Sequence, residues 1–377
     1  MIKVLMFNKL YHPSMGGVER LVYDLCEEIK GKVELKVLAA NTKFKTEIEQ
    51  RDKYQVTRAA SLGCVMSSVH LGIGIPWWWT RLESDIIHFH FPSPVAELYC
   101  LALSPKEKPI VVTYHSDIIG HKLAMFFYRP FLINFIKRAT RIVTTSPEMI
   151  ENSPFLSKVK DKCRVIPYGI QMDKFKLTAE VKARSEAIKG KFKSPIILFV
   201  GRLVKYKGVD YLIEAMRDIN ATLLIIGEGP EEKRLKELIG EIGIEEGRIF
   251  FIGKVEDKEL LAYYYASHVF VLPSISNNEA FGIVQLEAQA CGRPVVSTAL
   301  PTGVPFVNLN GETGIVVPPK SSEKLAEAIN RLLEDGTLRL RLGEQAKKRV
   351  ESQFTREIMA QKTLELYKEL MSLKKEV

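Results

Sequence analysis

Two acids eight positions apart mark the segment with the most specific chemistry in the sequence, which runs from Pro273 to Glu287. Glu279 follows an apolar run typical of a buried strand, and Glu287 lies about two turns into a predicted helix. Carboxylates accept hydrogen bonds from hydroxyl groups, so the two acids together can hold one elongated, hydroxyl-rich ligand. The amides at the start of the helix are expected to face an anionic part of that ligand, and they belong to Ala280, Phe281, Gly282 and Ile283.

Two cations form a second candidate site in the segment that begins at Gly201 and ends at Gly208. Arg202 and Lys207 follow a predicted strand and precede a predicted helix, which is where α/β sheets bind ligands. Arg presents a planar fork and Lys a compact charge, so this pair suits a diphosphate. The segment does not contain the GxxxxGK[ST] pattern of a Walker A loop.

Two weaker signals lie in the first half of the chain. Gly16 and Gly17 precede a predicted helix, where bare backbone amides can approach a phosphate, although a simple tight turn explains the pair equally well. His115 ends a predicted strand and could donate a hydrogen bond to a substrate hydroxyl, although a lone histidine is more often structural. His88 and His90 share one face of a strand, and without a third ligand nearby we interpret them as structural rather than metal-binding.

Short, often β-branched apolar runs supply the strands that must position these residues. In the first half they alternate with helical segments such as Val18–Lys30, and a second alternating series begins near Pro195. The strands are predicted at Ile2–Phe7, Val33–Ala39, Ile86–Phe91, Ile110–Tyr114, Arg141–Thr145, Ile196–Val200, Thr222–Ile226, Ile249–Ile252, Val269–Leu272, Pro294–Ser297 and Gly314–Val317.

Two successive βαβ series predict an α/β protein with two doubly wound, Rossmann-like domains that face each other across a cleft. The junction is expected in the polar stretch Pro167–Lys193. We assign residues 1–168 to an N-terminal domain and 169–357 to a C-terminal domain, and we expect a last helix at about 358–377 to pack back on the N-terminal domain.

Composition limits the class of protein. The chain has 377 residues, of which 46% are hydrophobic and 26% charged, an ordinary globular balance. Its five cysteines are far apart and form no CxxC pair, so neither a disulfide framework nor a structural zinc site is expected. The first residues read as a strand rather than a signal peptide, and no long apolar run predicts a spanning helix, so we expect a cytoplasmic protein.

The net charge of +9 is concentrated in one region. Residues 101–200 contain 18 Lys and Arg against 8 Asp and Glu, a balance of +10, so the remaining residues are close to neutral. Such a region attracts phosphates, anionic lipid or nucleic acid, and it can also be an ordinary solvated face.

The motifs taken in order resemble those of the retaining, family 4 glycosyltransferases with a GT-B fold, and the likeness covers essentially the whole chain. It rests on the Glu279–Glu287 segment, which matches the family's E-x7-E motif, together with Gly16-Gly17, His115, the loop from Gly201-Arg202 to Lys207-Gly208, Gly227-Glu228-Gly229-Pro230 and Phe251-Ile252-Gly253. The resemblance implies transfer of a sugar from a nucleotide diphosphate to an acceptor hydroxyl with retention of the anomeric configuration.

The resemblance also implies a role for each matched residue. Glu279 would hold hydroxyls of the donor sugar and Glu287 those of the ribose, while Arg202 and Lys207 would hold the diphosphate in place of a metal ion. Gly16 and Gly17 would offer amides to the diphosphate from the opposite domain, and His115 would contact the transferred sugar. The base would meet the backbone of Gly253, Lys254 and Val255. No cofactor or metal is expected, and GDP-mannose is favoured over a UDP-hexose as donor.

The acceptor is expected at the N-terminal domain, where two features are unusual. Trp77, Trp78 and Trp79 are consecutive, and Lys122–Arg141 mixes apolar and basic residues in a helix that Pro130 should kink or end. Together they suit a membrane surface that carries a lipid-linked acceptor, which would place the protein peripherally on the inner face of the cell membrane. The alternative is that the aromatic residues are core and the acceptor is a soluble saccharide.

Three other functions are weighed against transfer. A sugar-nucleotide epimerase shares the architecture but needs no acceptor. A starch- or glycogen-type synthase shares the fold, but this chain lacks its extra length and its lysine-bearing glycine loop. A nucleic-acid-binding protein would explain the basic stretch but not the E-x7-E segment, so no nucleic-acid partner is expected.

Overall fold

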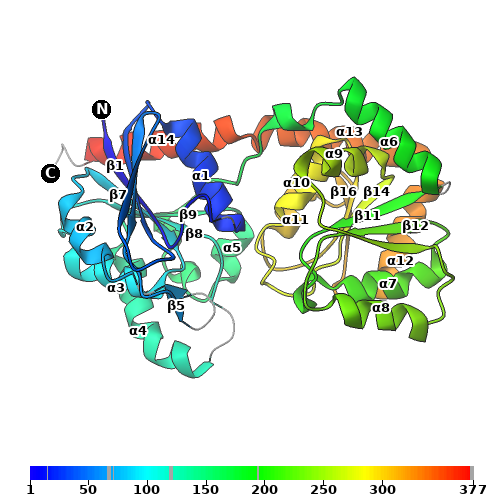
Figure 1. Cartoon of the computed structure of the whole chain (residues 1–377), viewed down its shortest axis with the longest axis horizontal. Coiled ribbons are helices and arrows are strands. Elements are labelled where there is room, and N and C mark those ends of the chain that lie inside the picture. The colour runs from blue at the N-terminus through cyan, green and yellow to red at the C-terminus, as the bar shows by residue number, and fades with distance from the viewer. Residues whose placement is uncertain (15, 66–68, 71, 119–121, 193–194, 374–377) are drawn as a thin grey trace. The chain divides into compact units, whose positions relative to one another are not determined.

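The structure is a computed structural model that describes the chain except for residues 15, 66–68, 71, 119–121, 193–194 and 374–377 (Figure 1). Its internal contacts divide the chain into two compact units. Unit 1 comprises Met1–Tyr168 together with Arg356–Val377, and unit 2 comprises Gly169–Thr355. The last helix therefore belongs to the unit formed by the first half of the chain.

Unit 1 contains an eight-stranded sheet that is parallel except for one edge strand. Its order is β10 (Cys163–Val165), β9 (Arg141–Thr144), β8 (Ile110–Tyr114), β7 (Ile86–Phe91), β1 (Lys3–Asn8), β2 (Glu34–Ala40), β4 (Tyr54–Ala59) and the antiparallel β3 (Glu47–Arg51). A separate two-stranded ribbon joins β5 (Cys64–Val65) to β6 (Val69–His70). The central strands β7 and β8 are buried at every position, which explains their continuous apolar sequences.

The helices of unit 1 within the described residues are α1 (Gly17–Ile29), α2 (Ile75–Arg81), α3 (Pro94–Leu103), α4 (Lys122–Arg138), α5 (Pro147–Asn152) and α14 (Arg356–Leu373), with short 3₁₀ turns at Leu156–Lys158 and Lys160–Lys162. In Figure 1 the red helix α14 lies beside the blue helix α1. An ion pair between Arg356 and Asp24 joins these two helices. Their apolar side chains pack on β1, β2 and β4 in one core, to which Leu25, Ile29, Met359 and Tyr367 belong.

Unit 2 contains a six-stranded, wholly parallel sheet. Its order is β13 (Ile249–Gly253), β12 (Thr222–Ile226), β11 (Ile196–Val200), β14 (Val269–Leu272), β15 (Val295–Thr298) and β16 (Gly314–Val317). Its helices are α6 (Ala179–Phe192), α7 (Val209–Ala215), α8 (Glu232–Glu241), α9 (Asp257–Ala266), α10 (Ile283–Ala290), α11 (Val304–Val307), α12 (Ser322–Glu334) and α13 (Gly336–Gln353), with 3₁₀ turns at Met172–Phe175, Lys205–Lys207 and Met216–Asp218.

Alternate side chains of β11 enter two different cores. Ile197 and Phe199 pack with residues of α7, α8 and α12, whereas Ile196, Leu198 and Val200 pack with residues of α6, α9 and α10. Because successive side chains of a strand point to opposite faces, the sheet of unit 2 carries helices on both faces. The predicted α/β class with two Rossmann-like parallel sheets is confirmed.

The structure adds detail to three expectations about local structure. The boundary between the units, after Tyr168, lies within the stretch Pro167–Lys193 where the junction was expected, and the rest of that stretch contains helix α6, which packs on α9 inside unit 2. Of the two effects expected of Pro130, a kink or an end of the helix, the end does not occur, because Pro130 lies inside α4. The β3–β4 hairpin was not predicted: Glu47–Arg51 forms an edge strand of charged and half-exposed residues with no apolar run.

Candidate functional site

Three loops of unit 2 are held together at the carboxyl ends of neighbouring strands. The amide of Gly201, after β11, donates to Ile226 O at 2.9 Å, and the amide of Leu203 donates to Glu228 O at the same distance. The amide of Gly227, after β12, donates to Gly253 O at 2.8 Å. The segments 201–203, 227–229 and Gly253 therefore lie side by side at the sheet edge where α/β proteins bind ligands.

Lys207 and Glu279 form a buried ion pair at this edge. Lys207 Nζ lies 2.5 Å from Glu279 Oε2, and both side chains are about one-tenth exposed. Ser274, which is fully buried, donates its hydroxyl to the same carboxylate oxygen at 2.9 Å. Although burial alone would lower it, the pKa of the Lys207 ammonium is raised on balance by the Glu279 carboxylate. The structure thus brings together one predicted cation and one predicted acid.

Backbone packing at Gly208 joins the cation loop, residues 201–208, to the acid loop, residues 273–282. Gly208 has φ +64°, and a Cβ atom there would lie 2.2 Å from Pro273 O, so only glycine fits. Beside it, the amide of Ile275 donates to Tyr206 O at 2.8 Å. The loop that carries Lys207 and the loop that carries Glu279 therefore form one packed backbone unit.

Glu287 lies in α10 and has a different partner. The buried Tyr264 of α9 donates its hydroxyl to Glu287 Oε2 at 2.8 Å. Burial and this carboxylate raise the pKa of Tyr264 well above its ordinary value, so the phenol stays a donor. Glu287 itself is half-buried and lies in the second turn of the helix, as the sequence predicted.

The residues between the two acids are anchored by the surrounding backbone. Gly282 precedes α10 with φ +72°, and Ile283 is the first residue of the helix. Ala280 O accepts from the amide of Gly303 at 2.8 Å. Phe281 is buried against Phe354 and so belongs to the core rather than to a ligand-facing surface.

The other predicted residues of unit 2 lie near these loops but are more open. Arg202 and Lys254 are exposed, whereas Val255 is partly buried against the core. Their positions directly after β11 and β13 place them at the same sheet edge as Gly201 and Gly253.

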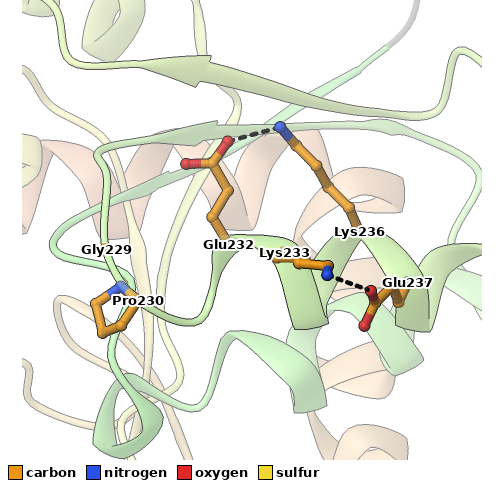
Figure 2. Close-up of a pocket in the computed structure, with 6 residues that line it drawn as sticks. All are labelled: Gly229, Pro230, Glu232, Lys233, Lys236 and Glu237. Carbon is orange, nitrogen blue, oxygen red and sulfur yellow. Dashed lines mark hydrogen bonds and ion pairs between the residues drawn. The ribbon is translucent and has the colours of Figure 1, made fainter.

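A pocket of about 660 Å³ opens next to the Gly227-Glu228-Gly229-Pro230 segment. Figure 2 shows that the charged side chains lining it pair along helix α8, Glu232 with Lys236 and Lys233 with Glu237. The separations are 2.6 Å and 3.9 Å. Its cations are balanced by acids one turn away, and it contains none of the predicted site residues.

In unit 1, the Gly16-Gly17 pair begins helix α1, with Gly16 as the N-cap residue and Gly17 as the first helical residue. Both are exposed. A Cβ atom on Gly16 would lie 2.3 Å from Glu19 Oε2, so a carboxylate occupies the space beside the helix start. This acid would oppose a phosphate at the same point, and the Gly-Gly motif did not signal it.

His115 is buried in a chain of hydrogen bonds on the sheet of unit 1. Its Nδ1 pairs with the hydroxyl of Tyr168, and its Nε2 lies 2.9 Å from His90 Nδ1. Burial, with the nearby His88 and Lys9, lowers the pKa of His115 to about 3, so the ring is neutral. Both ring nitrogens are thus engaged within unit 1.

His88 and His90 share one strand face as predicted, with their rings stacked 4.7 Å apart. His88 contacts Tyr367 Oη at 2.5 Å and Thr113 Oγ1 at 2.7 Å. These contacts agree with the structural interpretation of the pair. Across the described residues, no group of three or more His, Cys, Asp or Glu is arranged to hold a metal ion.

The aromatic and basic features of unit 1 divide between core and surface. On α4, the more than half-exposed residues include Phe126, Phe127 and Phe131. The buried apolar residues of the same helix include Leu132, Phe135 and Ile136. In the tryptophan run, Trp77 is exposed beside Arg81, Trp78 is half-buried and Trp79 is core. Within the described ranges, no helix has the length and apolar character to cross a membrane.

Sequence reasoning missed several residues that hold the predicted ones. Ser274 and Tyr264 hold the two acids, and His90 and Tyr168 hold His115. Ser274 lies five residues before Glu279, a local signal that could have been used. Tyr264 and Tyr168 lie far from their partners in sequence, and only the fold brings them into contact.

Solved structures share this fold over nearly the whole chain. The sucrose-phosphate synthase of Thermosynechococcus elongatus superimposes with a TM-score of 0.78 and 22% identity, covering 98% of this chain and 99% of that one. HepE of Anabaena, solved in complex with UDP, has a TM-score of 0.76 and 19% identity, covering 98% and 100%. The two Rossmann-like sheets thus define the GT-B class of glycosyltransferase fold.

Sequence comparison gives the family. Residues 181–349 match the family described as glycosyl transferases group 1, and residues 15–174 match glycosyltransferase family 4. The D-rhamnosyltransferase WbpZ of Pseudomonas aeruginosa is 32% identical over 94% of this chain and 92% of its own length. The chain therefore belongs to the glycosyl transferases group 1 and is a glycosyltransferase.

Two further relatives are similar over most of the chain. The O-antigen chain mannosyltransferase C of Escherichia coli is 29% identical over 99% of this chain and 100% of its own. A GDP-mannose-dependent alpha-(1-6)-phosphatidylinositol monomannoside mannosyltransferase of Mycolicibacterium smegmatis is 27% identical over 88% and 89%.

Proposed function

We propose that this glycosyltransferase moves mannose from GDP-mannose to a hydroxyl of a lipid-linked glycan, with retention of configuration and without a metal ion. Two of its relatives are named as mannosyltransferases, and one of them as dependent on GDP-mannose. A UDP-hexose is the second choice of donor, because HepE, which shares the fold, was solved with UDP.

The observation that carries the proposal is the Lys207–Glu279 pair beside the three joined loops of unit 2. Glu279 Oε2 accepts from both Lys207 and Ser274, whereas Oε1 accepts no hydrogen bond from the part of the chain that the structure describes. That oxygen is suited to accept from a sugar hydroxyl, while the Lys207 ammonium can turn to a diphosphate. Cations held in place before reaction stabilise the charge that develops on a leaving diphosphate.

Glu287 complements this arrangement from the adjacent helix. With one oxygen fixed by Tyr264, its carboxylate is oriented to accept from a pair of ribose hydroxyls. Arg202 adds an exposed cation for the diphosphate, and the backbone around Gly253, Lys254 and Val255 meets the base. In unit 1, the family resemblance assigns Gly16 and Gly17 to the diphosphate, which requires the Glu19 carboxylate to move aside. It assigns His115 to the transferred sugar, which the ring would meet through its carbon atoms, because both ring nitrogens are engaged.

A thermal-shift panel tests the donor. GDP-mannose should raise the melting temperature more than GDP, UDP or UDP-glucose, because a ligand that binds only the folded state stabilises it by mass action. The shift should shrink in Glu287→Ala. Equal stabilisation by every nucleotide sugar, or by none, would overturn the donor assignment.

The lipid-linked acceptor is supported by the exposed face of α4. Phe126 and Phe127 pack edge to face with centroids 5.4 Å apart, and both are at least two-thirds exposed. Arg129 and Lys137, also exposed, flank them on the same helix. An apolar face with basic flanks suits the surface of an anionic membrane on its cytoplasmic side.

Vesicle sedimentation tests this surface. Phe126→Ala/Phe127→Ala should remove a part of binding that persists in high salt, and Arg129→Glu/Lys137→Glu a part that salt screens. Lys189→Glu/Lys191→Glu on α6 of unit 2 is the matched control, with the same change of charge elsewhere. Loss of binding in the control to the same extent, or no binding of the wild type at low salt, would favour a soluble saccharide acceptor.

A further inference from the structure

Three neighbouring strands of unit 1 line up a set of polar side chains that the proposed reaction does not explain. Met6 lies on β1, His90 on β7, and His115 directly follows β8. Since β1, β7 and β8 are adjacent and parallel, these side chains meet on one sheet face, which α1 and α14 cover. A cavity of about 20 Å³, lined by His88, His90 and His115 among others, lies there.

The donor and acceptor in each hydrogen bond of this series follow from its last member, the Met6 sulfur. His90 Nε2 lies 3.0 Å from Met6 Sδ, and a thioether sulfur has no hydrogen to donate. His90 Nε2 must therefore carry the proton. Burial, together with His88 and His115, lowers the pKa of His90 well below its ordinary value, so His90 is neutral and its Nδ1 accepts.

The same reasoning passes along the chain to His115. Because His90 Nδ1 accepts, His115 Nε2 must donate across the 2.9 Å contact. A neutral His115 then has an accepting Nδ1, which receives the hydroxyl proton of Tyr168. One arrangement of protons satisfies every contact, and it leaves His115 a single tautomer.

We propose that His90 and Tyr168 are positioning residues. Their two hydrogen bonds hold His115 as the neutral Nε2–H tautomer and fix the orientation of its ring. The role of His115 toward the donor sugar rests on the proposed function, whereas the tautomer does not. Tyr168 is also the last residue of unit 1 before the polypeptide continues into unit 2, so its hydrogen bond joins His115 to that end of the first segment of unit 1.

Nitrogen-15 NMR of the histidine rings tests the tautomer directly, and the chain has only seven histidines. In the wild type at neutral pH, His115 Nε2 should give the signal of a protonated nitrogen and Nδ1 that of an unprotonated one. Tyr168→Phe removes the donor to Nδ1 and leaves only the preference set by His90, so the two signals should move part of the way toward each other as the second tautomer becomes populated. A protonated Nδ1 in the wild type would overturn the proposal.

Tyr367→Phe is the matched control, because it removes a buried tyrosine hydroxyl from His88, a neighbouring histidine outside this chain. It should leave the His115 signals unchanged, although its cost in folding stability should be similar. The same change in both variants would mean that general loosening of the core, rather than Tyr168, sets the tautomer.

Turnover gives an independent test. Loss of the partner that orients a metal-ligating histidine lowers activity by roughly 10- to 100-fold. By analogy we expect the lower end for a histidine that binds no metal, so Tyr168→Phe should lower kcat about tenfold with little change in the KM for the donor. In a His115→Ala background the same substitution should have no further effect. An undiminished effect there would overturn the positioning role. A wild type without transferase activity would instead refute the proposed function, and the NMR result would still stand.

Discussion

The two candidate sites bury their polar groups in different ways, although unit 1 also contains a buried ion pair elsewhere, between Arg356 and Asp24. Unit 1 holds His90, His115 and Tyr168 in a neutral chain, in which each contact fixes the proton of the next. Unit 2 buries an ion pair, Lys207 with Glu279, in which each charge compensates the other. A neutral chain is satisfied as it stands, whereas an ion pair can exchange partners when another charged group arrives. The difference suggests that unit 1 provides fixed geometry and unit 2 provides charges that respond to a ligand.

Removal of Glu279 should have the largest effect. Glu279→Ala deletes the carboxylate proposed to hold the reacting sugar, and turnover should fall by roughly a hundredfold or more. Steady-state assays with GDP-mannose measure this. Wild-type turnover in the purified variant would refute the site assignment.

The folding of this variant needs its own control. Glu279→Ala leaves the Lys207 ammonium buried without its counter-charge, and breaking a buried pair costs about 3–5 kcal/mol of folding stability. Glu279→Ala/Lys207→Met removes both charges and should recover much of the melting temperature without restoring turnover. Glu287→Ala should weaken nucleotide affinity more than Glu279→Ala does.

Removal of Lys207 should have the next largest effect. Lys207→Met should cost at least tenfold in turnover, about 1.4 kcal/mol. It also leaves the Glu279 carboxylate buried without its counter-charge, so the melting temperature should fall as well. The measurements are steady-state turnover and thermal melting.

Arg202→Ala provides the comparison for Lys207→Met. Arg202 is exposed, whereas Lys207 is buried in the ion pair with Glu279, so the loss of Arg202 should also cost at least tenfold in turnover but leave the melting temperature nearly unchanged. An equal fall in melting temperature in both variants would mean that the ion pair does not stabilise the fold.

Mild acid should lower the folding stability of unit 1, and this effect should be smaller than those of the substitutions above. Burial lowers the pKa of His88 and of His115 to about 3, so the stability that these neutral rings provide is complete above pH 6.5 and is lost as the pH falls toward 3. The buried Glu97 opposes this, since burial raises its pKa to about 8, but it is one group against three histidines. The melting temperature should fall by several degrees between pH 7 and 5.

Hydrogen exchange can assign that loss to one unit. In unit 2, His268 is the histidine whose pKa burial lowers, to about 4, so amides of β11 and β12 should keep their protection longer than those of β7 and β8. Loss of protection in unit 2 first would reverse the comparison between the units.

Chelation should have the smallest effect of all. Since Arg202 and Lys207 are proposed to neutralise the diphosphate, EDTA should leave turnover nearly unchanged. Loss of activity with EDTA and its return on addition of magnesium or manganese would show that the cations of unit 2 do not suffice.

Strands were predictable here because a parallel sheet buries them on both faces. Ile86–Phe91, Ile110–Tyr114 and Thr222–Ile226 have the predicted bounds, since continuous apolar runs leave little choice of structure. The edge strand Glu47–Arg51 is charged and was missed, because an edge needs no apolar run. Helix α6 was missed for a related reason: only two of its side chains, Val181 and Ser185, are buried.

At the candidate site, the sequence identified the residue types but not their partners. The spacing of Glu279 and Glu287 gave their placement in a loop and a helix. It could not give the bond from Tyr264 to Glu287, which joins two helices, or the bond from Tyr168 to His115, which joins residues 53 positions apart. The sequence also could not distinguish the exposed Phe131 from the buried Phe135, because the face that a helix buries is set by the elements against which it packs.

The contact of Gly208 with Pro273 O has a consequence for redesign of the enzyme. A Cβ atom on Gly208 would lie 2.2 Å from Pro273 O, which leaves no room for a methyl group. The loop that carries Lys207 and the loop that carries Glu279 therefore cannot be altered or exchanged one at a time. A chimaera that takes residues 201–208 from one relative and 273–282 from another joins two backbones that were never fitted together. Because these two loops are proposed to bind the donor, donor preference is best transplanted by taking both loops from one parent.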